Sequence, residues 1–212
     1  PQTEIFPKQD DILGKKKDFK SYGIDIQFEE DALYELAVRA YEEKTGARGL
    51  VSAVEKALLK FEKRLPSTDI RQFVVTREVV ENPELELERL LQDPVHPERL
   101  AQFEKLLSRE KRELKESIMS REGEFRKRYG IAFPESRIDL IARRMVDKGY
   151  DVNTVFEEVV EVQRQVEEFE RDFQQRNGIR LQFDGEAVDR ITEMALEENM
   201  KGEMVCFRLL KD

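Results

Sequence analysis

Apolar residues spaced three and four positions apart recur along most of the chain and predict a largely helical protein. A first helix is expected over 31–44, and its apolar face consists of Leu33, Leu36, Ala37, Ala40 and Tyr41. A second helix is expected from 51 to 63, and its stripe consists of Leu50, Val51, Val54, Ala57, Leu58 and Phe61. The break between these helices reads Lys44-Thr45-Gly46-Ala47-Arg48-Gly49-Leu50.

Two short segments alternate between apolar and polar residues, as half-buried strands do. The first contains Ile24, Ile26 and Phe28, and the second covers 70–75. A short helix with Phe19 on its inner side is expected over 11–21, after a polar linker that contains two prolines. The predicted fold class is therefore α+β and helix-dominated.

The remainder of the chain predicts further helices, two of them long. A short acidic helix over 84–91 precedes an apolar stripe over 98–128, which suits either one helix or two with a break near 120–123. Another long helix is expected over 151–176. The two long helices are expected to form an antiparallel arm within 84–176 that packs on its own chain. Pairing with a helix of another chain is the alternative.

An internal repeat relates the two ends of the chain. The segment Tyr22-Gly-Ile-Asp-Ile-Gln-Phe28 recurs as Asn177-Gly-Ile-Arg-Leu-Gln-Phe183, and the similarity continues without gaps. Arg48 then falls opposite Glu203, so 177–212 is interpreted as a truncated, degenerate second copy that keeps the fold. A looser third copy over 129–150 requires a two-residue deletion, and chance similarity is its alternative explanation.

The break at 44–50 contains the candidate functional residues. Gly46 suits a helix end that needs positive φ, and Gly49 permits close backbone approach as the next helix begins. Arg48 follows Ala47 and projects from the first turn of that helix, where unpaired N–H groups and a guanidinium together favour a phosphate. On spacing alone, a solvated arginine beside an ordinary turn is the alternative.

The same residues carry a family resemblance over 18–80. The chain there resembles the C-terminal small domain of the ClpX branch of AAA+ protein unfoldases. The matching motifs are Tyr22–Phe28, Lys44–Leu50, Leu65-Pro66-Ser67 and Phe73–Thr76. The resemblance implies that Arg48 is the family's sensor-2 arginine, which contacts ATP phosphates from a corner formed with Gly46, Ala47 and Gly49. After Pro83 the chain departs from the family.

The resemblance further implies a lid domain, over 1–83, that closes over ATP and magnesium held by a larger domain. The implied partners are that large domain, neighbouring subunits of a homo-oligomeric ring and protein substrates, with a peptidase as a further option. The chain begins at Pro1 and ends inside a helical pattern, so it is expected to be a fragment of an ATPase. Alone it is expected to hold no cofactor, because it contains no phosphate-binding Gly-x-x-x-x-Gly-Lys-Ser/Thr loop.

Composition excludes several other functions. A formal net charge of −9 argues against non-specific nucleic-acid binding, and no apolar run is long enough to span a membrane. The single cysteine, Cys206, fits a buried structural thiol in a reducing cytoplasm, and His96 is interpreted as a loop residue without a metal or catalytic role. The competing hypothesis is a helical protein–protein interaction scaffold without a nucleotide role, which would expose an apolar stripe.

Overall fold

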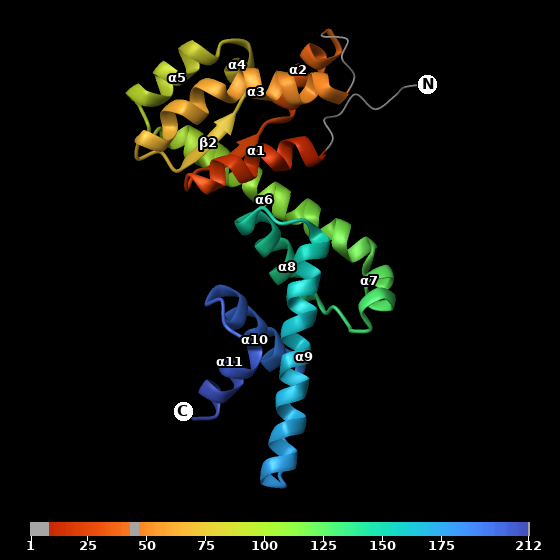
Figure 1. Ribbon diagram of the computed structural model, residues 1–212. Helices are drawn as coiled ribbons and strands as arrows, with labels where there is room; N and C mark the ends of the chain where they lie inside the picture. Colours follow the sequence, from red (N-terminus) through yellow and green to blue (C-terminus); the bar gives the residue numbers. More distant parts are fainter. Residues whose placement is uncertain (1–8, 43–46, 212) are drawn as a thin grey trace. The chain divides into compact units, whose positions relative to one another are not determined.

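The computed structural model describes residues 9–42 and 47–211, and the side chains of 12–42 and 49–211. The structure is dominated by helices and contains a small parallel sheet (Figure 1), which confirms the predicted α+β class. The chain divides into two compact units, unit 1 (residues 1–110) and unit 2 (residues 111–212), and the division falls within helix α6.

Unit 1 contains the elements that the sequence predicts most clearly. In chain order it consists of α1 (Gln9–Ser21), β1 (Asp25–Phe28), α2 (Glu30–Glu42), α3 (Ala47–Arg64), a 3-10 turn (Leu65–Ser67), β2 (Gln72–Val75), α4 (Arg77–Glu81), α5 (Pro83–Gln92) and the first part of α6 (Pro97–Ser120). These bounds confirm the helices and strands predicted up to residue 91. His96 lies in the loop between α5 and α6, as predicted.

β1 and β2 form a parallel pair in which Asp25 lies opposite Gln72 and Phe28 opposite Val75. Parallel strands need a long crossover connection, and α2 and α3 provide it. The N–H of Asp25 donates to the carbonyl of Arg71 over 2.8 Å, and the N–H of Glu29 donates to the carbonyl of Val75 over 3.0 Å. Residues 25, 27 and 29 therefore turn their backbone groups toward β2, because successive strand residues alternate.

The core of unit 1 joins the sheet to α3 and α1. Phe61 of α3 is fully buried and stacks on Phe73 of β2 with a centroid distance of 4.6 Å. Phe19 of α1 lies 6.3 Å from the same ring. Most of the predicted apolar stripes are buried, but Tyr41 is 77% exposed and Val51 is 40% exposed. Both lie close to the break between α2 and α3.

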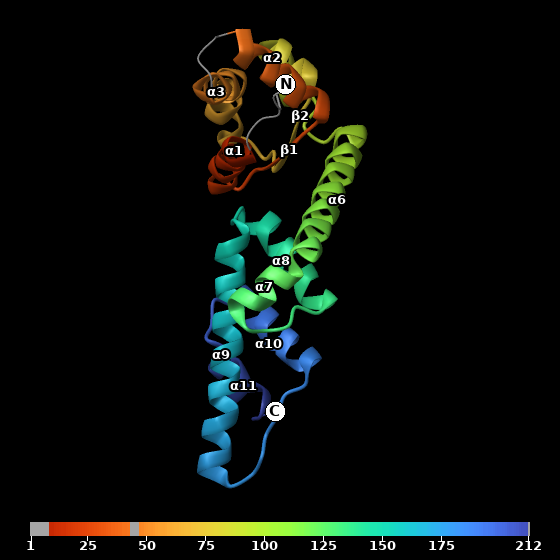
Figure 2. The same ribbon diagram turned by 90° about the vertical axis from the view of Figure 1, so that its right-hand side faces the viewer.

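Unit 2 contains the rest of α6, followed by α7 (Glu122–Tyr129), α8 (Glu135–Lys148), α9 (Val152–Asn177), α10 (Gly185–Glu197) and α11 (Gly202–Leu209). For 98–128 the sequence allows one helix or two with a break near 120–123. The structure has two, because α6 ends at Ser120 and α7 begins at Glu122. The sequence predicts an antiparallel arm of the two long helices, but the helices packed along α9 are α8, α10 and α11 (Figure 2). The apolar face of α9 is covered by these shorter helices.

The helix boundaries follow the internal repeat. α2 and α10 both start and end 155 positions apart (185 − 30 and 197 − 42), and α3 and α11 start 155 positions apart (202 − 47). In the looser copy, α8 and α9 start 105 positions after α2 and α3 (135 − 30 and 152 − 47). Each copy has a glycine with positive φ after its preceding helix, namely Gly23, Gly130 and Gly178. These correspondences support a unit that occurs three times.

The extended segment after this glycine differs among the copies. It forms β1 in the first copy, whereas residues 131–134 and 179–184 adopt no strand. The expectation that the last copy keeps the fold therefore holds for its helices and is wrong for the strand. The reason is that a strand needs a partner, and among the described residues the only sheet is the β1–β2 pair.

Phe61→Ala is expected to lower the free energy of unfolding of unit 1 by about 3–5 kcal/mol, because it leaves a cavity beside Phe73. The measurement is hydrogen exchange of the β2 amides at increasing urea concentration. Leu59→Ala, on the same helix but 47% exposed, is the matched control and is expected to change stability by at most about 0.5 kcal/mol. Equal losses in both variants would show that Phe61 does not anchor α3.

Candidate functional site

The predicted functional corner lies at the start of α3. Ala47 is the first residue of α3, Arg48 the second and Gly49 the third, which confirms that Arg48 belongs to the first turn of a helix. Gly46, and with it the rest of 43–46, lies outside the described residues, as does the side chain of Arg48. The direction of the Arg48 guanidinium therefore stays a prediction.

The start of α3 suits an anion electrostatically. The first N–H groups of a helix lack intrahelical partners, and the helix dipole adds positive potential at the same end. The first turn of α3 contains no acidic residue that would offset this potential. Gly49 is buried and Leu50 is only 8% exposed, so this helix end is packed against the domain.

Two arginines of α2 and α4 are held by carboxylates. Arg39 donates to Glu35 over 3.1 Å, and Arg77 donates to Glu81 over 2.7 Å. The hydrogen bond with Glu81 is the main reason why the pKa of Arg77 is raised. Glu35 also lies 3.7 Å from Arg77, so the four residues form one ion-pair group. The guanidinium groups of these two arginines are therefore already engaged by carboxylates.

The counterpart of this corner at the start of α9 is closed by a carboxylate. Asp151 accepts the N–H of Asn153 over 3.0 Å and that of Thr154 over 3.1 Å, and the hydrogen bond from the Thr154 hydroxyl is the first cause of its lowered pKa. Asn153 occupies the position that matches Arg48 (153 − 105). An anion would meet a negative charge here, so this copy is unsuited to a phosphate.

The counterpart at the start of α11 is closed in another way. The N–H of Gly202 donates to the side chain of Gln165 over 2.6 Å, and a Cβ at Gly202 would lie 3.0 Å from Val162. Glu203 occupies the position of Arg48 and is about half exposed. The close packing on α9 and the acidic side chain both disfavour a phosphate at this position.

Unit 1 has a cavity of about 40 Å³ between β2, α5 and α6, lined in part by Phe73, Leu90 and Phe103. This volume holds only one or two water molecules, so the cavity is far too small for a nucleotide. Within residues 9–42 and 47–211, no cluster of His, Cys, Asp or Glu could hold a metal ion. The helices of the same ranges include none with the length and apolarity needed to cross a membrane.

The first elements of unit 1 match a known domain. Residues 11–67, which extend from α1 to the 3-10 turn, match the family model of the C-terminal, D2-small domain of ClpB protein. This segment is an AAA+ small domain. The match covers about a quarter of the 212 residues and stops before β2, although β2 pairs with β1 and packs on α3. The match supports the AAA+ small domain that the resemblance implies, over residues 18–67 of the predicted 18–80, and it names ClpB and not the ClpX branch.

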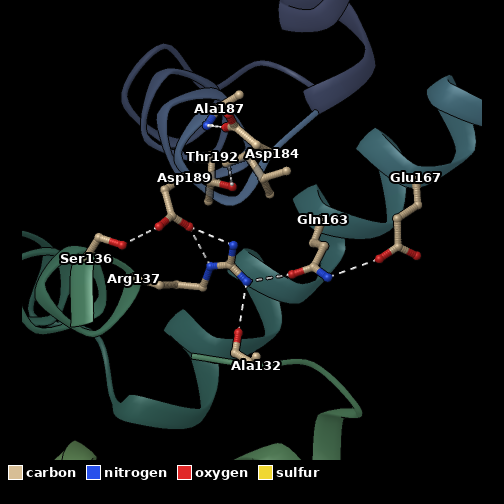
Figure 3. A network of polar contacts seen from close by, with 10 residues as sticks. Ala132, Ser136, Arg137, Gln163, Glu167, Asp184, Ala187, Asp189 and Thr192 are labelled. Atoms are coloured by element: carbon tan, nitrogen blue, oxygen red, sulfur yellow. Dashed lines mark hydrogen bonds and ion pairs between the residues drawn. The ribbon is translucent and has the colours of Figure 1, made fainter. Parts of the chain in front are cut away.

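A buried polar network in unit 2 has no counterpart among the sequence predictions (Figure 3). Arg137 of α8 is 5% exposed and donates to Asp189 of α10 over 2.7 Å, to Gln163 of α9 over 2.8 Å and to the Ala132 carbonyl over 3.0 Å. The chain itself satisfies this guanidinium, which joins three helices and leaves no group for a ligand. The repeat could have predicted that Arg137 is buried, because Arg137 corresponds to the buried Ala32 of the first copy (137 − 105).

Arg137→Ala is expected to destabilise unit 2 by about 3–5 kcal/mol, because it leaves the Asp189 carboxylate buried without its cation. Urea unfolding followed by hydrogen exchange of α8 and α10 measures this loss. The double variant Arg137→Met/Asp189→Leu is expected to lose less than Arg137→Ala, since it removes both charges. Arg190→Ala, on the same helix as Asp189 but with a side chain 66% exposed, is the neutral control. A double variant less stable than Arg137→Ala would contradict this account.

Cys206 is a buried structural thiol, as predicted. It lies in α11 with no exposed surface, and burial raises the pKa of its thiol to about 11. At pH 8 the folded chain therefore holds about a hundredfold less thiolate than an exposed cysteine with the ordinary pKa of 9.0. A disulfide reagent is expected to label Cys206 at once in urea and only slowly in the folded chain. Equal rates would show that α11 is open in solution.

Proposed function

We propose that unit 1 is the lid domain of a ClpX-like ATP-dependent protein unfoldase and that Arg48 is its sensor-2 arginine. In this proposal a larger domain binds ATP and magnesium, and closure of the lid brings the guanidinium of Arg48 onto the phosphates. The partners are that large domain and the neighbouring subunits of a homo-oligomeric ring in the cytoplasm. Hydrolysis releases the contact, so that nucleotide state becomes domain motion.

The observation that carries this proposal is the placement of Arg48 in the first turn of α3 within an AAA+ small domain. A guanidinium there adds a bidentate donor to the N–H groups of a helix start. The Gly-Ala-Arg-Gly-Leu motif and the Leu-Pro-Ser stop at the two ends of α3 favour the ClpX branch. Arg48 has two counterparts in the later copies, Asn153 and Glu203. Both lie at helix starts that side chains of the chain cap, so the proposed nucleotide role is restricted to unit 1.

The packing of α3 would make the small domain a lever. Phe61 lies about three and a half helical turns from Arg48. It stacks on Phe73 of β2, which is paired with β1. A displacement at Arg48 would therefore move α3 and the sheet together, because the core between them is close-packed. Such rigid-body motion is the mechanical output that an unfoldase needs.

Arg48→Ala tests the proposal in a chain that includes the ATP-binding domain. Loss of a donor aimed at the reacting phosphate is expected to lower ATP turnover about tenfold to a hundredfold, or to uncouple turnover from protein unfolding. Arg48→Lys is expected to restore only part of the activity, because an ammonium cannot bind a phosphate bidentately.

Glu203→Ala, at the matching position of α11, is the control and is expected to leave ATP turnover unchanged. Circular dichroism of all variants establishes that the fold is intact. Turnover and unfolding that are both equal to wild type in Arg48→Ala would remove the proposed role.

A further inference from the structure

We propose that the first part of α6, residues 97–110, is a releasable cover on the second face of the β1–β2 sheet, the face opposite the core. The cover opens while the apolar core of unit 1 stays folded, and it thereby controls access to that face. α6 runs beside the two strands (Figure 2) and lies outside residues 11–67, which match the small-domain family. The inference does not depend on the role proposed for Arg48.

The two faces of the sheet differ in polarity, because successive residues of a strand point to opposite sides. One face supplies the core of unit 1 with the side chains of Ile26, Phe28, Phe73 and Val75. The second face carries Gln27 of β1 together with Gln72 and Val74 of β2. Gln27 is 6% exposed and Val74 is 7% exposed, so this face is covered as well.

Polar contacts attach α6 to the second face. The side-chain amide of Gln27 donates to one oxygen of the Glu110 carboxylate over 2.8 Å. Lys16 of α1 donates to the other oxygen over 2.6 Å, so Glu110 joins α6 to both β1 and α1. Gln72 of β2 donates to Glu104 over 3.2 Å. α6 is thus attached to both strands through carboxylate acceptors.

Two further contacts attach α6 to the start of α2. Gln102 donates to Glu29, and Arg109 lies 3.7 Å from Glu30. The side chains of Arg109 and Glu30 are 41% and 71% exposed, so water and salt compete with this ion pair. Partly exposed polar contacts of this kind contribute little net stability. The attachment of α6 is therefore expected to be weak and sensitive to ionic strength.

Apolar packing adds little to this attachment. Within 97–110 Phe103 is buried, whereas Leu100, Leu106 and Leu107 are only half-buried, and the described core of unit 1 contains no residue of α6. The cavity of about 40 Å³ lies beside Phe103, between β2, α5 and α6. Atoms that line a void lose packing contacts on that side. Helix α3, in contrast, belongs to the core along most of its length.

The chemistry of the second face permits release. Its amide side chains can bind water once α6 has left, whereas exposure of Phe73 or Val75 would open the core. Regions with few buried apolar contacts open locally at a lower free energy than the whole domain. α6 also carries the chain from unit 1 into unit 2, so a pull on the later residues would act on this cover first.

The test compares the labelling of an introduced thiol on each face of β2 in the 212-residue chain. Val74→Cys places the thiol on the second face, and Val75→Cys places it in the core. Each rate is followed by mass spectrometry of the β2 peptide, which separates it from Cys206, and is divided by the rate of the same variant in urea. This ratio is expected to be about tenfold or more higher for Val74→Cys than for Val75→Cys, because local opening needs less free energy than opening of the core.

Glu110→Ala removes the acceptor that Gln27 and Lys16 share. It is expected to raise the ratio of Val74→Cys about threefold or more and to leave that of Val75→Cys within about twofold. NaCl at about 0.5 M is expected to act in the same direction, because it screens the ion pairs of α6. Lys105→Ala, at an exposed position of the same helix, is the matched control and is expected to leave both ratios unchanged.

Equal ratios for the two thiols would overturn the proposal, because α6 would then leave only together with the core. An unchanged ratio of Val74→Cys after Glu110→Ala, or an equal increase at both positions, would do the same. Hydrogen exchange of the wild-type chain is the second measurement and serves if a cysteine variant does not fold. The amides of 101–110 are expected to exchange through a smaller opening free energy than those of β2, and the reverse order would also overturn the proposal.

Discussion

The parallel pairing of β1 with β2 is the constraint on which unit 1 depends. It joins residues separated by the whole α2–α3 crossover, and the hydrogen bonds of Asp25 and Glu29 fix its register. The pair also inserts Phe73 between α1 and α3, where it contacts Phe19 and Phe61. Because α3 begins with the Ala47-Arg48-Gly49 corner, the same contacts that close the core also set the axis along which Arg48 is presented.

Unit 2 repeats the helices of this domain without the strand pair, so its stability has another origin. The 26-residue helix α9 gives an apolar face to α8, α10 and α11, and Val155, Val159 and Val166 are buried on it. The buried Arg137 binds a carbonyl of the segment that matches β1 and also reaches α9 and α10. A buried cation is a costly replacement for sheet hydrogen bonds, because its desolvation has to be offset by Asp189 and Gln163.

The features that the sequence predicts correctly are those determined locally. Helix periodicity and the Leu-Pro-Ser stop lie within a few residues, and they define α2, α3 and α9 closely. A strand is a property of a pair, so the Ile-x-Leu-x-Phe pattern at 179–183 does not by itself determine a strand. The Arg137–Asp189 pair joins helices 52 residues apart, which periodicity does not connect. For Arg48, the sequence predicts a place on the helix, whereas the direction of its side chain depends on contacts beyond that turn.

The first and the last copy differ in the residues at the start of their second helix. The first copy pairs β1 with β2, and it has an arginine at the start of α3, whose first turn contains no acidic residue. In the last copy, the side chain of Gln165 accepts the N–H of Gly202 at the start of α11, and Glu203 makes this helix start acidic. A change of few residues thus turns a helix start that suits an anion into one that disfavours it. One helical unit can therefore present different chemistry at the same position of different copies without a change of fold.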